Sequence, residues 1–151
     1  MTLEVGEIAP EVRLPNQDGE TVEVDMHGPV VLYFYPRDHT SGCTTEARQF
    51  ELERETYEEA GVTVYGISTD DVETHADFCE AEGLGFDLLA DTEVEVADAF
   101  DVSIHANKTK RTTFVVIDGE IHRVYANVNP DGHARSVLKD LLDDGIVELA
   151  E

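Results

Sequence analysis

The feature that decides the fold is one uninterrupted apolar run at residues 30–35, which reads Val30-Val31-Leu32-Tyr33-Phe34-Tyr35. The run has no polar residue in alternate positions, as is typical of a strand covered on both faces. It is also far shorter than the roughly 18 apolar residues that a membrane helix needs. We therefore expect it to be the central strand of a sheet.

Working outward from this run, the spacing of apolar residues and turn signals predicts alternating strands and helices. The expected elements are an amino-terminal hairpin (12–14 and 21–24), a helix from the end of the 36–42 loop to about residue 60, a strand (63–67), a helix (72–82), an extended piece (86–89), a helical turn (95–100), a second hairpin (112–117 and 120–125) and a final helix (133–142). A βαβ order followed by a hairpin and a helix favours a thioredoxin-like α/β fold, with a central mixed β-sheet flanked by helices. The chain has 151 residues and no linker, so we expect a single domain over residues 1–151.

The charge is strongly negative, because 34 Asp and Glu stand against 10 Lys and Arg, a formal net charge of -24. Such a surface repels nucleic acid and anionic membranes, so we expect neither as a main partner. The amino terminus has no basic, apolar leader, which predicts a cytoplasmic protein. Self-repulsion of this size is screened only at high salt, where the Debye length falls to about 3 Å near 1 M. We therefore expect a protein from a halophile; the alternative is an acidic face for a basic partner.

Of the two cysteines, Cys43 has the position that points to chemistry. It follows the apolar strand and a seven-residue loop, and it falls in the first turn of the expected helix. The free N–H groups and partial positive charge of a helix start favour the thiolate, which is the nucleophilic form of cysteine. A fast reaction also needs donors that stabilise the transition state, and Thr40, backbone N–H groups or an arginine can supply them.

The stretch from Val31 to Ala47 resembles the active-site segment of the peroxiredoxins, specifically the bacterioferritin comigratory protein or peroxiredoxin Q group. The pattern Pro-x-x-x-Thr-x-x-Cys is met by Pro36, Thr40 and Cys43. Further similar segments are 5–10, 64–70 and 111–118, so the resemblance extends over most of the chain.

The resemblance implies a thiol peroxidase in which Cys43 attacks a peroxide oxygen and becomes a sulfenic acid. It implies that Thr40 hydrogen-bonds the peroxide, that Arg111 stabilises the thiolate and the transition state, and that Pro36 shields the sulfur from bulk water. No cofactor is implied. The implied substrates are hydrogen peroxide and organic hydroperoxides, and the implied reductant is a thioredoxin-like protein. The resemblance also implies a monomer, with a weak dimer as the alternative.

The chain departs from the usual family pattern at two positions. Ser41 stands where the family usually has proline, which changes the rigidity of the loop. Arg48 stands where many members carry the second, resolving cysteine. Other members place it in the next helix, and Cys79 matches that variant. The resemblance thus implies a Cys43–Cys79 disulfide. The Cα atoms of a disulfide lie within about 7 Å of each other, so a cysteine in the middle of a helix can be reached only if one or both helices unwind locally. The alternative is a one-cysteine peroxidase in which Cys79 is an ordinary core residue.

Two other classes of protein compete with this interpretation. His39 and Cys43 repeat the spacing of His75 and Cys79, and two histidines with two cysteines are a ligand set for structural zinc. A thiol–disulfide oxidoreductase is the second, but the chain lacks the Cys-x-x-Cys motif of that class. The remaining histidines show no catalytic spacing, and we interpret them, with His75, as surface or loop residues: His27, His105, His122 and His133.

Overall fold

The computed structural model describes residues 2–147, and its centre is a five-stranded mixed sheet in the order β5-β4-β3-β8-β9. The strands β3, β4 and β5 are parallel, whereas β8 is antiparallel to β3 and β9 is antiparallel to β8. Their bounds are β3 (Val30–Phe34), β4 (Thr63–Ser68), β5 (Asp87–Ala90), β8 (Thr112–Ile117) and β9 (Glu120–Ala126). This confirms the thioredoxin-like α/β fold.

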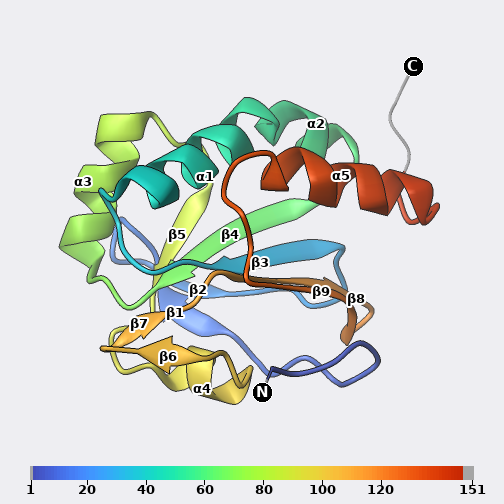
Figure 1. Cartoon of the computed structure of the whole chain (residues 1–151), viewed down its shortest axis with the longest axis horizontal. Helices are drawn as coiled ribbons and strands as arrows, with labels where there is room; N and C mark the ends of the chain where they lie inside the picture. The colour runs from blue at the N-terminus through green and yellow to red at the C-terminus, as the bar shows by residue number, and fades with distance from the viewer. Residues whose placement is uncertain (1, 148–151) are drawn as a thin grey trace.

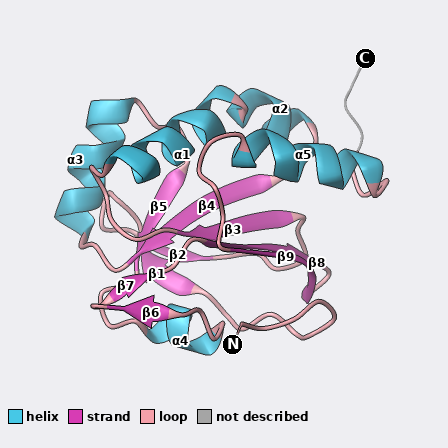
Figure 2. Cartoon of the chain, viewed as in Figure 1, coloured by secondary structure: helices cyan, strands magenta, loops and turns pink. Residues whose placement is uncertain are grey.

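Strand β3 is buried on both faces because a layer covers each side of the sheet. Figures 1 and 2 show α1, α2, α3 and α5 on one face and α4 on the other. Val31 and Tyr33 pack into the cluster under the larger helical layer, whereas Leu32 and Phe34 pack into the opposite cluster. The helices are α1 (Ser41–Leu52), α2 (Arg54–Glu59), α3 (Val72–Glu82), α4 (Glu95–Ala99) and α5 (His133–Asp143). Among residues 2–147, none of these helices has the length and apolar character needed to cross a bilayer.

Two small hairpins lie outside the central sheet. Strands β1 (Arg13–Pro15) and β2 (Thr21–Glu23) form the predicted amino-terminal hairpin. Strands β6 (Ile104–His105) and β7 (Lys108–Thr109) form a second one, which the sequence pattern did not predict. Its two turn residues, Ala106 and Asn107, have φ of 50° and 62°.

The prediction of a single helix to about residue 60 is wrong, because the structure has two helices that are separated at Glu53. Glu53 has φ -93° and ψ 2°, outside the helical region, and α2 starts at the next residue. The change of direction carries Tyr57 to α5, where its hydroxyl donates to the carbonyl of Ala134. A buried tyrosine hydroxyl needs a hydrogen-bond acceptor. The spacing of apolar residues, from which a single helix was predicted, does not indicate where that acceptor lies.

The fold brings three segments together beyond the end of β3. The chain leaves β3 through Tyr35 and Pro36 and turns into α1. The hydroxyl of Thr109 donates to the carbonyl of Tyr35 at 2.8 Å and ties the β7–β8 segment to this exit. Because Thr112 pairs with Phe34, the residue before β8, Arg111, lies beside the same loop.

Candidate active site

Cys43 lies in the first turn of α1, as predicted, and its side chain faces the core. Thr40 is the residue before the helix, with extended backbone at φ -85° and ψ 154°. The side chain of Cys43 is a free thiol and the residue is only 1% exposed. The sulfur therefore sits at the positive end of a twelve-residue helix, in surroundings that exclude most water.

Thr40 and Pro36 flank the loop that leads to Cys43. The Thr40 hydroxyl donates to the carbonyl of Arg37 at 2.9 Å, so it does not cap the helix. With its proton directed there, the Thr40 oxygen still has lone pairs that can accept a hydrogen bond from a hydroperoxide O–H. Pro36 is half-buried and directly follows the buried Tyr35.

Arg111 reaches the loop from the neighbouring strand. Its Nη2 lies 2.6 Å from the position that a Cβ on Gly42 would occupy, and a ring carbon of Pro130 lies 3.6 Å from the same position. A side chain at Gly42 would therefore have to displace the end of the Arg111 side chain. The structure thus places the Arg111 cation against the residue next to Cys43, and brings together the arginine and cysteine singled out in the sequence.

Glu46 is a site residue that the sequence analysis missed. Its Oε1 accepts from Arg111 Nη1 at 3.0 Å, and the carboxyl side chain is 1% exposed. Its Oε2 is buried and has no partner among the described residues. Burial raises the pKa of Glu46 to about 7, although the charge of Arg111 lowers it. The signal was available, since a glutamate three residues after Cys43 lies on the same helix face and must find a cation if that face is buried.

This burial predicts a pH-dependent contribution to stability. Between the ordinary glutamate pKa of 4.5 and about 7, the folded state holds the Glu46 proton more tightly than the unfolded state, so stability is lost as the pH rises through this window. Glu46→Gln removes the titration. We expect the free energy of unfolding of the variant, relative to that of wild type, to increase between pH 5 and pH 8 by up to about 3 kcal/mol. Urea unfolding at several pH values measures this; a difference that stays constant with pH would contradict it.

Cys79 lies on α3 and packs, half-buried, against the same core cluster that contains Cys43. Burial raises the pKa of its thiol to about 12, and the carboxylates of Asp38, Asp87 and Asp18 act in the same direction. Both cysteines are free thiols. A protonated thiol inside a helix is a poor nucleophile, so Cys79 can attack only after its surroundings change.

The proposed zinc ligands do not converge on one point. His75 is fully buried and directs Nδ1 to Asp38 and Nε2 to the carbonyl of Leu89. His39 instead contacts the ring of Phe78, with centroids 5.2 Å apart. Among residues 2–147, the one group of three or more potential metal ligands consists of Asp38, Asp70 and His75, without either cysteine. A Cys2His2 site is therefore not formed.

Two histidines that we interpreted as surface or loop residues are buried. The first is His75 in α3. The second is His133, at the start of α5, whose Nε2 lies 2.8 Å from the Thr113 hydroxyl oxygen. Burial lowers the pKa of His133 to about 4, so the ring is neutral near pH 7. Both were misplaced because the groups that satisfy them in the core, Asp38 for His75 and Thr113 for His133, come from distant segments of the chain.

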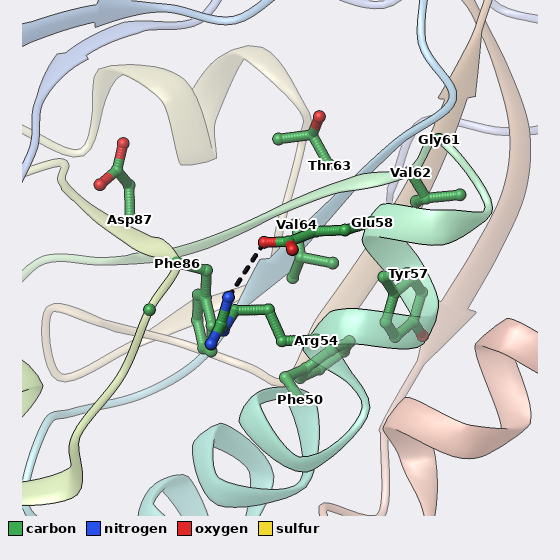
Figure 3. Close-up of a pocket in the computed structure, with 11 residues that line it drawn as sticks. Phe50, Arg54, Tyr57, Glu58, Gly61, Val62, Thr63, Val64, Phe86 and Asp87 are labelled. Atoms are coloured by element: carbon green, nitrogen blue, oxygen red, sulfur yellow. Dashed lines mark hydrogen bonds and ion pairs between the residues drawn. The ribbon is translucent and has the colours of Figure 1, made fainter.

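A pocket of about 390 Å³ lies at the opposite end of α1 from Cys43 (Figure 3). It is lined by the end of α1, by α2 and by the first residues of β4 and β5. Figure 3 shows Arg54 inside it, bound to Glu58 by an ion pair of 3.1 Å. None of the sequence-predicted site residues lines this pocket, so it is a gap between the helices and the sheet edge and not the place of the thiol chemistry.

The thioredoxin-like sheet, the buried thiol at a helix start and the adjacent arginine define the class of thiol-dependent peroxidases. The family comparison agrees, since residues 5–124 match the model of the AhpC/TSA family. The chain belongs to this family, and its relatives place it in the bacterioferritin comigratory protein or peroxiredoxin Q group.

The relatives cover nearly the whole chain. It is 39% identical to the peroxiredoxin Bcp of Bacillus subtilis, over 95% of this chain and 98% of that protein. The crystal structure of peroxidoxin BcpB from Mycobacterium tuberculosis superposes with a TM-score of 0.87 at 33% identity, covering 93% of this chain and 97% of that one. A structure of the Xanthomonas campestris bacterioferritin comigratory protein, described in connection with alkyl peroxide reduction, has a TM-score of 0.81 at 30% identity and covers 88% and 91% of the two chains. The protein is thus a peroxiredoxin that reduces peroxides with electrons from a thiol.

Proposed function

We propose that Cys43 is the peroxidatic residue of this thiol peroxidase. The observation that carries the proposal is the position of Cys43, buried in the first turn of α1, with the Arg111 guanidinium against the adjacent Gly42. The Cys43 sulfur attacks one peroxide oxygen, the O–O bond breaks, and the other oxygen leaves as water or an alcohol after taking a proton. Cys43 becomes a sulfenic acid.

The neighbouring residues act on the charge that moves during this step. Arg111 is a fixed cation that stabilises negative charge on the sulfur and on the departing oxygen. Glu46 orients that guanidinium through the 3.0 Å ion pair. Thr40 accepts a hydrogen bond from the peroxide, and Pro36 limits the access of water. No cofactor takes part in this scheme.

We propose that Cys79 resolves the sulfenic acid. Its sulfur attacks the Cys43 sulfur, the S–S bond forms, the S–O bond breaks, and hydroxide takes a proton to leave as water. The relatives support this pairing, because structures of Xanthomonas campestris peroxiredoxin Q include two cysteine-to-serine variants whose positions lie 36 residues apart, the separation of Cys43 and Cys79. Rapid-reaction peroxide reduction and non-reducing mass analysis of Cys43→Ser and Cys79→Ser test both assignments.

A thioredoxin-like protein is the reductant that matches an intramolecular disulfide, since it carries out thiol–disulfide exchange. Hydrogen peroxide and small organic hydroperoxides are the substrates that we propose, with a monomer in the cytoplasm as the working form.

We propose that the acidic surface is an adaptation to high salt. Because exposed carboxylates repel one another less as the Debye length shortens, we expect the melting temperature to rise by about 5 °C or more between 0.1 M and 2 M KCl. Thermal unfolding followed by circular dichroism measures this. A melting temperature that is flat or falls over this range would favour a basic partner as the reason for the charge.

A further inference from the structure

A buried polar cluster lies beneath the loop that leads to Cys43. Its centre is the ion pair between Asp38 and His75, whose side chains are both completely buried, with Oδ2 and Nδ1 2.6 Å apart. The Tyr35 hydroxyl donates to the other carboxylate oxygen of Asp38 at 2.6 Å. The backbone N–H of Asp38 donates to Asp70 at 2.7 Å. None of these groups is needed to bind or cleave a peroxide in the scheme above.

The His75 ring is held at both of its nitrogens. Both ring nitrogens face oxygen acceptors, because Nδ1 lies against Asp38 and Nε2 lies 3.1 Å from the carbonyl of Leu89 in β5. His75 is therefore fixed between the loop that carries Asp38 and strand β5, with both ring nitrogens within hydrogen-bonding distance of an oxygen. Separating this fully buried pair leaves polar groups without hydrogen-bond partners unless water reaches them, so the contact is either closed or fully open to water.

The pair joins the two segments that carry the cysteines. Asp38 belongs to the loop between Pro36 and Thr40, and His75 lies on α3 one helical turn before Cys79. Figure 1 shows α3 at one end of the helical layer, next to the start of α1. Two contacts nearer the surface connect the same segments, namely the rings of His39 and Phe78 and the ion pair of Arg48 with Glu82. Of the three links, only the Asp38–His75 pair is wholly inaccessible to water.

We propose that the Asp38–His75 pair is a clasp that holds α3 to the peroxidatic loop and must open before Cys79 can attack Cys43. The proposal rests on the resolving role of Cys79. While the clasp is closed, Cys79 stays half-buried beside the Asp38 carboxylate and cannot ionise readily. Opening frees α3 from the loop and exposes Cys79. Asp38 and His75 are therefore positioning residues for the second step.

The clasp determines which reaction the sulfenic acid undergoes. A closed clasp keeps the Cys43 sulfenic acid in the folded pocket, where a second peroxide can oxidise it to a sulfinic acid and be reduced to water or an alcohol. An open clasp favours the disulfide instead. A tighter clasp thus makes the enzyme more sensitive to excess peroxide, and a weaker clasp makes it more resistant.

The test uses Asp38→Asn and His75→Gln, each of which replaces one ionisable member of the pair by a polar amide side chain. Protein is mixed with peroxide, quenched with acid at millisecond intervals, and analysed by mass for sulfenic acid, disulfide and sulfinic acid. We expect disulfide formation to accelerate by about ten-fold in both variants, since breaking a buried pair strongly destabilises the closed state. The sulfinic fraction at a fixed peroxide excess should fall in proportion, while the first oxidation of Cys43 does not accelerate.

Two controls separate the clasp from general loss of stability. Ile121→Val shortens a buried side chain in the opposite core cluster and should leave disulfide formation at the wild-type rate. Tyr35→Phe removes one hydrogen bond to Asp38 but keeps the pair, so we expect a smaller acceleration. Unchanged or slower disulfide formation in both Asp38→Asn and His75→Gln, or equal acceleration in Ile121→Val, would overturn the proposal.

Hydrogen exchange on the reduced wild-type protein tests the clasp without relying on variants that fold poorly or on the chemistry of Cys79. We expect the amides of α3 to exchange faster than those of β3, through local opening. If they exchange only with global unfolding, the clasp does not open and the proposal fails. If oxidised wild type contains no Cys43–Cys79 disulfide, the resolving role fails and the clasp's role in it fails as well. A disulfide that forms at one rate in all variants overturns the clasp alone.

Discussion

Cys43→Ser is expected to lower the rate constant of peroxide reduction by at least about 10⁴-fold, because the substitution removes the nucleophile and leaves only the binding groups. Serine has nearly the size of cysteine, and its hydroxyl stays protonated near pH 7, so it does not attack the O–O bond. Stopped-flow consumption of hydrogen peroxide by the reduced protein measures the effect directly.

The matched control for this variant is Cys79→Ser, which makes the same chemical change at the other cysteine. Circular dichroism and melting temperature show whether Cys43→Ser is folded, which matters because residue 43 is only 1% exposed. A folded Cys43→Ser protein that consumes peroxide at a rate close to wild type would refute the assignment of the nucleophile.

Cys79→Ser has the second largest expected effect, and it separates the two halves of the catalytic cycle. The first turnover should keep its wild-type rate constant, because Cys79 takes no part in cleaving the peroxide. Steady-state turnover with a thioredoxin system should fall by about ten-fold or more, since the sulfenic acid then lacks its intramolecular partner. Stopped-flow mixing gives the first rate, and NADPH consumption gives the second.

Mass analysis under non-reducing conditions reports which product forms. Wild type treated with one equivalent of peroxide should lose two hydrogens, whereas Cys79→Ser should gain one oxygen atom. If wild type also gains an oxygen and turns over as fast as Cys79→Ser, the enzyme is a one-cysteine peroxidase and Cys79 is a core residue.

The central features of the fold could be predicted from the sequence because they depend on local apolar patterns. Six successive apolar residues at 30–35 leave no face for water, and this alone places the strand in the middle of the sheet. Helix α3 matches its predicted range because Asp71 caps it and Gly83 ends it in the left-handed conformation. The β6–β7 hairpin was missed because its strands have two residues each, too few to show a period.

The site was predictable in part, for the same physical reason. Cys43 and Thr40 lie on one continuous segment, so their relation follows from the start of a helix. The partners of Arg111 depend on the pairing of β3 with β8, which no local pattern reports. The burial of Glu46 and His75 was missed because a polar residue enters a core only when a partner from a distant segment satisfies it, and those partners, Arg111 and Asp38, lie 65 and 37 residues away.

Cys43 lies outside the central sheet, in the first turn of the helix that follows β3. Strand β3 ends before the loop that carries Asp38, and its hydrogen-bonded neighbours β4 and β8 do not have to move when one helical turn unwinds. If Cys79 resolves the sulfenic acid as proposed, the outer helices unwind and re-form in each oxidation cycle while the central sheet keeps its shape. The position of a second cysteine can therefore change from one outer helix to another while the central sheet beneath the first cysteine stays the same.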